Sequence, residues 1–206
     1  MADEESRSRL QTRPSLLFRL RDAGDDAAWR TFVDLYAPVI YGYGRRRGLN
    51  DSDAADVVQE VLVQVTRSIP TFDYRPERGR FRGWLLAVTR SKIARARRRA
   101  NPAASGPHDD ALIQALPDAG EDPDWLALYH AEILRVALER IRPDFEATTW
   151  RMFEEVWRHD RPAAEVAREL DRPIHAVYVA KSRVLQRLRD EVEALADDLT
   201  VLDNVR

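Results

Sequence analysis

The chain has 206 residues, of which 44% are hydrophobic and 33% are charged, with a formal net charge of −2 and no cysteine. This composition is typical of a soluble folded protein with one large domain or two small ones. The lack of cysteine excludes disulfides, cysteine-based zinc sites and thiol nucleophiles. No apolar run approaches the ~20 residues of a membrane-spanning helix, and the polar start does not resemble a secretory signal. We therefore expect a cytoplasmic protein.

Helical spacing of apolar residues runs through residues 14–100. Asp25 can cap a first long helix, which Pro38 should kink, and Asn50 can cap a second. The second helix is expected to bury one apolar stripe, Ala55, Val58, Leu62, Val65 and Ile69. A loop over residues 71–80 leads to a third helix with four residues facing inward, Phe81, Trp84, Leu85 and Val88. The pattern predicts one helical domain over residues 14–100.

Residues 101–123 are rich in proline, alanine, glycine and aspartate, which predicts a flexible acidic linker. Helical spacing resumes over residues 124–198 and predicts a second domain. Residues 162–170, a tight turn at 171–173 and a long helix after it have the dimensions of a helix-turn-helix. Five residues are expected to be buried between its helices, Val166, Leu170, Val177, Val184 and Leu188. The predicted fold class is all-α, with two small helical domains joined by a flexible linker.

Basic charge is concentrated in residues 73–99, where ten arginine and lysine residues face only Asp73 and Glu77 as local counter-charge. Tyr74, Phe81 and Trp84 are interleaved among them. Guanidinium groups match phosphate geometry and aromatic rings stack on unpaired bases, so a nucleic-acid surface is one interpretation. The other is a solvated basic helix, or one that pairs with acidic groups of the same protein. A contact between this helix and the acidic linker is physically plausible.

Catalytic chemistry finds little support in the sequence. The four histidines lie in different predicted elements without the spacing of metal ligands, and no glycine-rich phosphate-binding motif is present. Asp56 and Glu60 lie one helical turn apart, but without further ligands nearby a solvated or partner-facing surface is favoured over a metal site. We expect a binding protein without metal or cofactor, and not an enzyme.

Three motifs occur in a fixed order along the chain. The first is D-x-x-Q-E at Asp56, Gln59 and Glu60, and the second is F-R-G-W-L at residues 81–85. The third is E-V-A-R-E-L at residues 165–170, followed by V-x-x-x-x-S-R-V-L-Q-R-L-R at 177–189. Their order and spacing resemble those of extracytoplasmic-function (ECF) sigma factors. These are two-domain subunits of the sigma-70 superfamily that direct bacterial RNA polymerase to promoters and help to melt the DNA.

The resemblance implies three binding surfaces. Core polymerase would dock on a strip of the second helix formed by Asp56, Gln59, Glu60, Val63 and Arg67. The −10 region would be melted and held by residues of the loop and third helix, namely Phe72, Tyr74, Arg78, Arg80, Arg82, Arg90, Lys92, Arg95, Arg97 and Arg98. The −35 element would be read from the last helix by His175, Ala176, Tyr178, Val179, Lys181, Ser182 and Arg183.

The resemblance also implies core RNA polymerase and promoter DNA as partners, together with the anti-sigma factor that commonly restrains such proteins. Pro173 and Ala176 replace polar residues that are usual in the family, so the base preference at −35 is not predicted. The main alternative is a stand-alone helix-turn-helix regulator whose N-terminal domain dimerises or senses a ligand. Such a regulator would bind duplex DNA by itself. A nucleic-acid enzyme using Asp56, Glu60 or the arginines is a more distant alternative.

Overall fold

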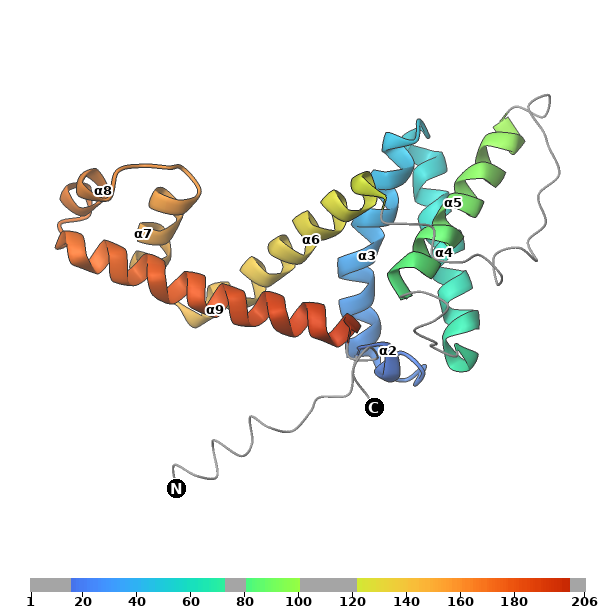
Figure 1. Ribbon diagram of the computed structural model, residues 1–206, viewed down its shortest axis with the longest axis horizontal. Helices are drawn as coiled ribbons and strands as arrows, with labels where there is room; N and C mark the ends of the chain where they lie inside the picture. The colour runs from blue at the N-terminus through green and yellow to red at the C-terminus, as the bar shows by residue number, and fades with distance from the viewer. Residues whose placement is uncertain (1–15, 73–80, 101–121, 201–206) are drawn as a thin grey trace, which may run out of the picture. The chain divides into compact units, whose positions relative to one another are not determined.

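The computed structural model describes residues 16–72, 81–100 and 122–200, with side chains up to residue 195. Within these ranges the chain forms helices and no strand, which confirms the all-α prediction there (Figure 1). None of the described helices is both long and apolar enough to cross a membrane. The chain divides into two compact units, of which the first extends to Glu132 and the second comprises Ile133–Ala196.

The first unit contains α2 (Leu16–Arg19), α3 (Asp26–Arg46), α4 (Asp51–Ser68), the short 3-10 helix η1 (Ile69–Thr71) and α5 (Phe81–Ala100). Both predicted caps are confirmed. The Asp25 carboxylate accepts a hydrogen bond from the Ala28 N–H at 2.9 Å, and the Asn50 side-chain oxygen accepts one from the Asp53 N–H at 2.8 Å. Pro38 lies inside α3 without ending it.

A glycine turn joins α3 to α4. Gly48 has a φ of +85°, in the left-handed region that glycine adopts without steric cost. Its N–H donates to the Arg45 carbonyl, and the Leu49 N–H donates to the Gly44 carbonyl. This pair of bonds satisfies carbonyls at the end of α3 and reverses the chain. As a result α4 packs against both α3 and α5 (Figure 1).

The core of the first unit is aromatic at its centre. Phe32, Tyr36 and Phe81 are fully buried, with ring centroids 4.9–6.1 Å apart. The predicted burial of Leu85 and Val88 is confirmed, whereas Trp84 is half-buried at the edge.

The predicted stripe of α4 is wrong in its first part. Ala55 is exposed, and Val58 and Leu62 are half-buried. The buried stripe is instead Ala54, Val57, Val61 and Val65, followed by Ile69. Both stripes have helical spacing and similar side chains, so the sequence pattern fits either one. The shift leaves the predicted polymerase strip on the opposite, outward side of the helix.

The second unit begins within α6 (Pro123–Ile141) and continues through the 3-10 helix η5 (Arg142–Asp144), α7 (Ala147–Trp157) and α8 (Ala163–Glu169) into α9 (Ile174–Thr200), as far as Ala196. The start of α6 belongs to the first unit, so the two units divide later in the chain than the expected boundary at residue 124. The helix-turn-helix is confirmed. Four of its predicted core residues are fully buried, Val166, Val177, Val184 and Leu188. Leu170 is partly buried against them.

The turn between α8 and α9 has the same hydrogen-bond pattern as the glycine turn. Asp171 takes the left-handed position with a φ of +49°. Its N–H donates to the Arg168 carbonyl, and the Arg172 N–H donates to the Ala167 carbonyl. Aspartate tolerates this conformation better than most non-glycine residues. The turn thereby brings Val177 of α9 against Val166 and Ala167 of α8 in one core cluster.

Candidate functional site

The predicted polymerase strip lies along the outer face of α4. Asp56, Gln59, Val63 and Arg67 are exposed, and Glu60 is half-buried. Positions three and four apart lie on one side of a helix, so these residues form a continuous surface. Val63 is 49% exposed and places an apolar group in the middle of the polar strip.

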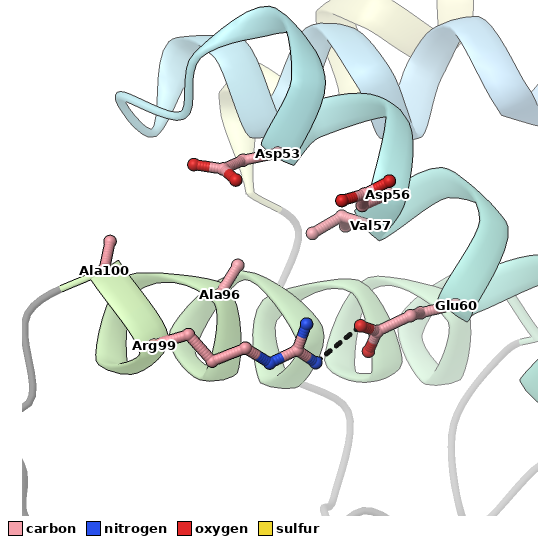
Figure 2. A pocket seen from close by; sticks show the side chains of 7 residues that line it. All are labelled: Asp53, Asp56, Val57, Glu60, Ala96, Arg99 and Ala100. Carbon is pink, nitrogen blue, oxygen red and sulfur yellow. Dashed lines mark hydrogen bonds and ion pairs between the residues drawn. The ribbon is translucent and has the colours of Figure 1, made fainter.

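A pocket of about 260 Å³ opens beside this strip, between α4 and α5. Figure 2 shows Asp53, Asp56 and Glu60 on the α4 side, facing Arg99 and two alanines on α5. The Arg99 Nη2 lies 2.6 Å from the Glu60 Oε1. This hydrogen bond raises the pKa of Arg99. Three carboxylates face a single guanidinium, so the pocket keeps an excess of negative charge.

Metal binding is not supported at this pocket. Within the described ranges, no group of three or more histidine, cysteine, aspartate or glutamate side chains is arranged to hold a metal ion. The carboxylates of the pocket favour a cationic side chain, and Arg99 already occupies part of it. The sequence predicts Arg99 only as part of the basic stretch, whose charge would position the protein on DNA.

The predicted −10 residues of α5 separate into three groups. Arg95 and Arg97 are exposed and Arg98 is half-buried along the C-terminal half of the helix. Lys92 is only 9% exposed, so little of this residue is presented to a ligand. Arg82 and Arg90 instead contact the start of α6. Tyr74, Arg78 and Arg80 lie outside the described residues.

Phe72, the predicted base-stacking residue before α5, packs at the edge of an aromatic cluster. Its ring centroid lies 5.7 Å from that of Phe81 and 5.1 Å from that of Trp84. The Arg21 Nη2 donates to the Phe72 carbonyl at 2.9 Å. Phe72 also lines a small apolar hollow of about 50 Å³ together with residues of α2. The sequence predicts no binding role for these α2 residues.

Asp122 is buried in the first unit and accepts several hydrogen bonds. Its Oδ2 accepts hydrogen bonds from the Tyr43 hydroxyl at 2.7 Å, the Arg47 Nη2 at 2.7 Å and the Arg90 Nη2 at 2.6 Å. Its Oδ1 accepts from the Asp124 and Trp125 N–H groups and so caps α6. Burial alone would raise the pKa of Asp122, but the hydrogen bonds from Tyr43 and Arg90 lower it to about 2. The plausible contact between the acidic linker and the basic helix is confirmed at this residue.

The predicted reading residues lie on the outward side of α9. His175, Ser182 and Arg183 are exposed, and Ala176 and Lys181 are half-buried. Tyr178 is 57% exposed and Val179 is 52% exposed. The buried side of the same helix carries Val177, Ala180 and Val184, which hold it against the rest of the unit. The arrangement leaves the predicted surface available to a ligand.

Residues 32–102 match the sigma-70 region 2 family, a segment that includes α4 and α5. The chain is 31% identical over 184 residues to the ECF RNA polymerase sigma factor SigD of Mycobacterium tuberculosis, across 85% of this chain and 82% of SigD. This chain belongs to the ECF sigma factor family. ECF sigma factor SigE of Mycolicibacterium smegmatis is 33% identical over 60% of this chain, a match that spans 48% of SigE. ECF sigma factor RpoE of Cereibacter sphaeroides is 24% identical over 86% of this chain and 93% of RpoE.

The similarity of this sigma factor to SigD extends well beyond the region 2 match, because it covers 85% of the chain. A relationship of that extent favours promoter-directed transcription initiation over the stand-alone regulator considered from the sequence.

Proposed function

We propose that this sigma factor binds core RNA polymerase through the α4 strip and promoter DNA through α5, the segment before it and α9. Bound in this way, it directs polymerase to its promoters in the cytoplasm and stabilises the opened −10 region. The observation that carries the proposal is the separation of charge within the first unit. Asp56 and Glu60 lie along α4, while exposed arginines continue along α5.

The α4 strip has the character of a protein-binding surface. Polar side chains at Gln59, Glu60 and Arg67 flank the exposed Val63, so a partner can bury an apolar centre within a polar rim. The excess carboxylates at Asp53, Asp56 and Glu60 complement a basic partner surface and discriminate against acidic ones. We assign this strip to core polymerase.

The exposed arginines of α5 suit the phosphates of DNA. Arg95 and Arg97 are exposed near the end of the helix, where they can contact a backbone without reading its sequence. Capture of an unpaired base requires aromatic groups, which Phe72 and Tyr74 would supply, while Arg78 and Arg80 hold the adjacent phosphates. Melting would thus be assigned to residues 72–80, with α5 positioning the strand.

The outward side of α9 suits the major groove. The helix follows a tight turn and exposes one side of its first three turns, as expected of a recognition helix. His175, Ser182 and Arg183 would supply polar contacts, with Tyr178 and Val179 between them. An anti-sigma factor is a further proposed partner.

Charge reversal on the α4 strip tests the polymerase assignment. The variant Asp56→Lys/Glu60→Lys should lose affinity for core polymerase in a pull-down and lose run-off transcription on a promoter library. A matched control reverses two exposed carboxylates of α9, Asp190→Lys/Glu193→Lys, which changes the net charge equally. The control should keep core association. Undiminished core binding by the α4 variant, with its helical circular dichroism intact, would falsify the assignment.

A further inference from the structure

The carboxylate of Asp122 occupies a socket formed by Tyr43, Arg47 and Arg90. One hydroxyl and two guanidinium groups converge on a single oxygen, with all three distances between 2.6 and 2.7 Å. The Arg90 Nε also donates to the Tyr43 hydroxyl at 3.0 Å, which fixes the geometry between two of the donors. Guanidinium donors of this kind bind phosphate oxygens as well as carboxylate oxygens. The three donors of the socket can therefore bind an anionic oxygen of a phosphate as well as that of Asp122.

The charge of the socket exceeds that of its occupant. Two guanidinium groups face the single carboxylate of Asp122, and the neighbouring Asp124 lies farther away, with its Oδ2 3.6 Å from the Arg47 Nη2. The Arg47 and Arg90 side chains are 39% and 41% exposed, so they reach the surface of the unit. Without Asp122, Arg90 would lose this ion pair and Arg47 would keep only its longer contact with Asp124, next to the arginines of α5.

The start of α6 also covers Arg82, a second residue that the sequence assigns to −10 DNA. The Arg82 guanidinium carbon lies 4.8 Å from the centroid of the Tyr129 ring. Tyr129 in turn stacks on Tyr36 of α3, with centroids 5.9 Å apart. In this arrangement the segment from Asp122 to Tyr129 engages both Arg82 and Arg90.

The same contact contains polar groups that lack hydrogen bonds. Within the described part of the chain, two buried side-chain nitrogens here have no hydrogen-bond partner, the Arg47 Nε and the Trp125 Nε1. Both belong to residues at the junction of α6 with α3. A buried polar group without a partner lowers stability, and it regains hydrogen bonds when water reaches it. The start of α6 is thus held by the ion pairs of Asp122, while neighbouring buried polar groups lack hydrogen bonds. We expect such a contact to open more easily than a fully hydrogen-bonded one.

We propose that Tyr43, Arg47 and Arg90 form a phosphate-binding socket for promoter DNA, which Asp122 keeps occupied until the start of α6 leaves it. This inference rests on the proposed function, because it assumes that α5 faces promoter DNA. The released socket adds Tyr43 and Arg47 to the DNA-binding residues predicted from the sequence. Asp122 acts as an internal competitor for the phosphate.

The test measures binding of the full-length chain to a fluorescent single-stranded DNA of mixed sequence, by anisotropy at several salt concentrations. Asp122→Asn removes the negative charge, while asparagine can still cap α6. Its affinity should rise several-fold, and its log–log salt slope should steepen by about 0.7 per phosphate gained. Adding Arg47→Ala to Asp122→Asn should return the slope toward that of the unmodified chain. The control Asp124→Asn makes the same charge change two residues away and should have a smaller effect.

A disulfide provides a second, reversible test, since the chain has no cysteine of its own. A Cβ placed on Gly42 would lie 3.0 Å from the Leu128 Cδ2, so the helices approach closely there. The variant Gly42→Cys/Leu128→Cys should close this contact when oxidised and weaken DNA binding, with recovery on reduction. Non-reducing electrophoresis verifies that the bond has formed.

Two results would contradict the phosphate-binding role of the socket. One is an equal effect of Asp122→Asn and Asp124→Asn on DNA affinity, and the other is equal DNA affinity of the oxidised and reduced cysteine variant. If core association and run-off transcription are normal in those experiments, the proposed function stands and the socket alone is wrong. Failure of the unmodified chain to associate with core polymerase would instead contradict the proposed function.

Discussion

Two valines of α9 allow the structural and reading roles of the helix to be separated. Val177 is fully buried in a cluster with Met152, Val166 and Ala180, whereas Val179 is 52% exposed. The substitutions Val177→Ala and Val179→Ala make the same chemical change two positions apart on the same helix. We expect the first to lower the stability of the helix-turn-helix and the second to weaken DNA binding without loss of stability.

The expected magnitude for Val177→Ala follows from its burial. Removal of two methyl groups costs about 1.6 kcal/mol at ~0.8 kcal/mol each, and the cavity that remains adds to this cost. Alanine returns roughly 0.6 kcal/mol through its higher helix propensity. The net loss is about 1–2 kcal/mol, which corresponds to a fall in Tm of roughly 4–16 °C for a unit of this size. Val179→Ala keeps the propensity gain and creates no cavity, so its Tm should stay level or rise slightly.

Thermal unfolding of the full-length variants, followed by circular dichroism, measures the first effect. Promoter binding of the reconstituted holoenzyme, measured well below both transitions, tests the second. At that temperature Val177→Ala should bind nearly as well as the unmodified protein, and Val179→Ala should bind more weakly. Equal losses of Tm in the two variants would refute the assignment of buried and outward sides to α9.

Arg99→Ala should raise core affinity no more than a few-fold by freeing Glu60, because an exposed ion pair contributes less than about 1 kcal/mol. Titration with core polymerase measures the change against Arg98→Ala, and a loss of affinity would contradict it. The lowered pKa of Asp122 predicts stabilisation that is present above pH 3.8 and lost as the pH falls toward about 2. The contribution to the free energy of unfolding is roughly 2 kcal/mol. Urea unfolding measured at several pH values should show that Asp122→Asn lacks this pH-dependent part. Arg97→Ala should weaken binding to all promoters alike and lower the salt slope by about one unit, as a phosphate contact does. A loss confined to one promoter would show that Arg97 reads bases.

Features encoded by neighbouring residues were predicted correctly from the sequence. The caps at Asp25 and Asn50 each depend on a side chain and a backbone group three residues later, so a short window contains the whole interaction. The helix-turn-helix is similar in this respect, because its core residues repeat at helical spacing over about two dozen positions.

The α4 stripe shows where a local pattern becomes ambiguous. Ala54 and Ala55 are adjacent, as are Val57 and Val58, so two neighbouring stripes have nearly the same hydrophobicity. The choice between them depends on which side meets α3 and α5, and that information lies elsewhere in the chain. The sequence pattern therefore does not determine that Ala54, Val57 and Val61 are the buried residues, whereas the structure does.

The Asp122 socket lies beyond what the sequence could predict in detail. Asp122 is separated by 79 residues from Tyr43, 75 from Arg47 and 32 from Arg90. The segregation of acidic and basic charge indicated that the linker and α5 could meet, without identifying the partners. The roles of the α4, α5 and α9 surfaces in binding stay predictions until the experiments above are done.

The outward side of α9 has an apolar centre, with Ile174, Tyr178 and Val179 each 45–57% exposed. Such side chains offer few hydrogen bonds to base edges, whereas they can contact the C5 methyl group by which thymine differs from cytosine in the major groove. If α9 reads promoter DNA as proposed, part of its specificity is methyl recognition. Deoxyuridine in place of thymine would then act as a mismatch although every base pair is preserved, and 5-methylcytosine could substitute in part for thymine.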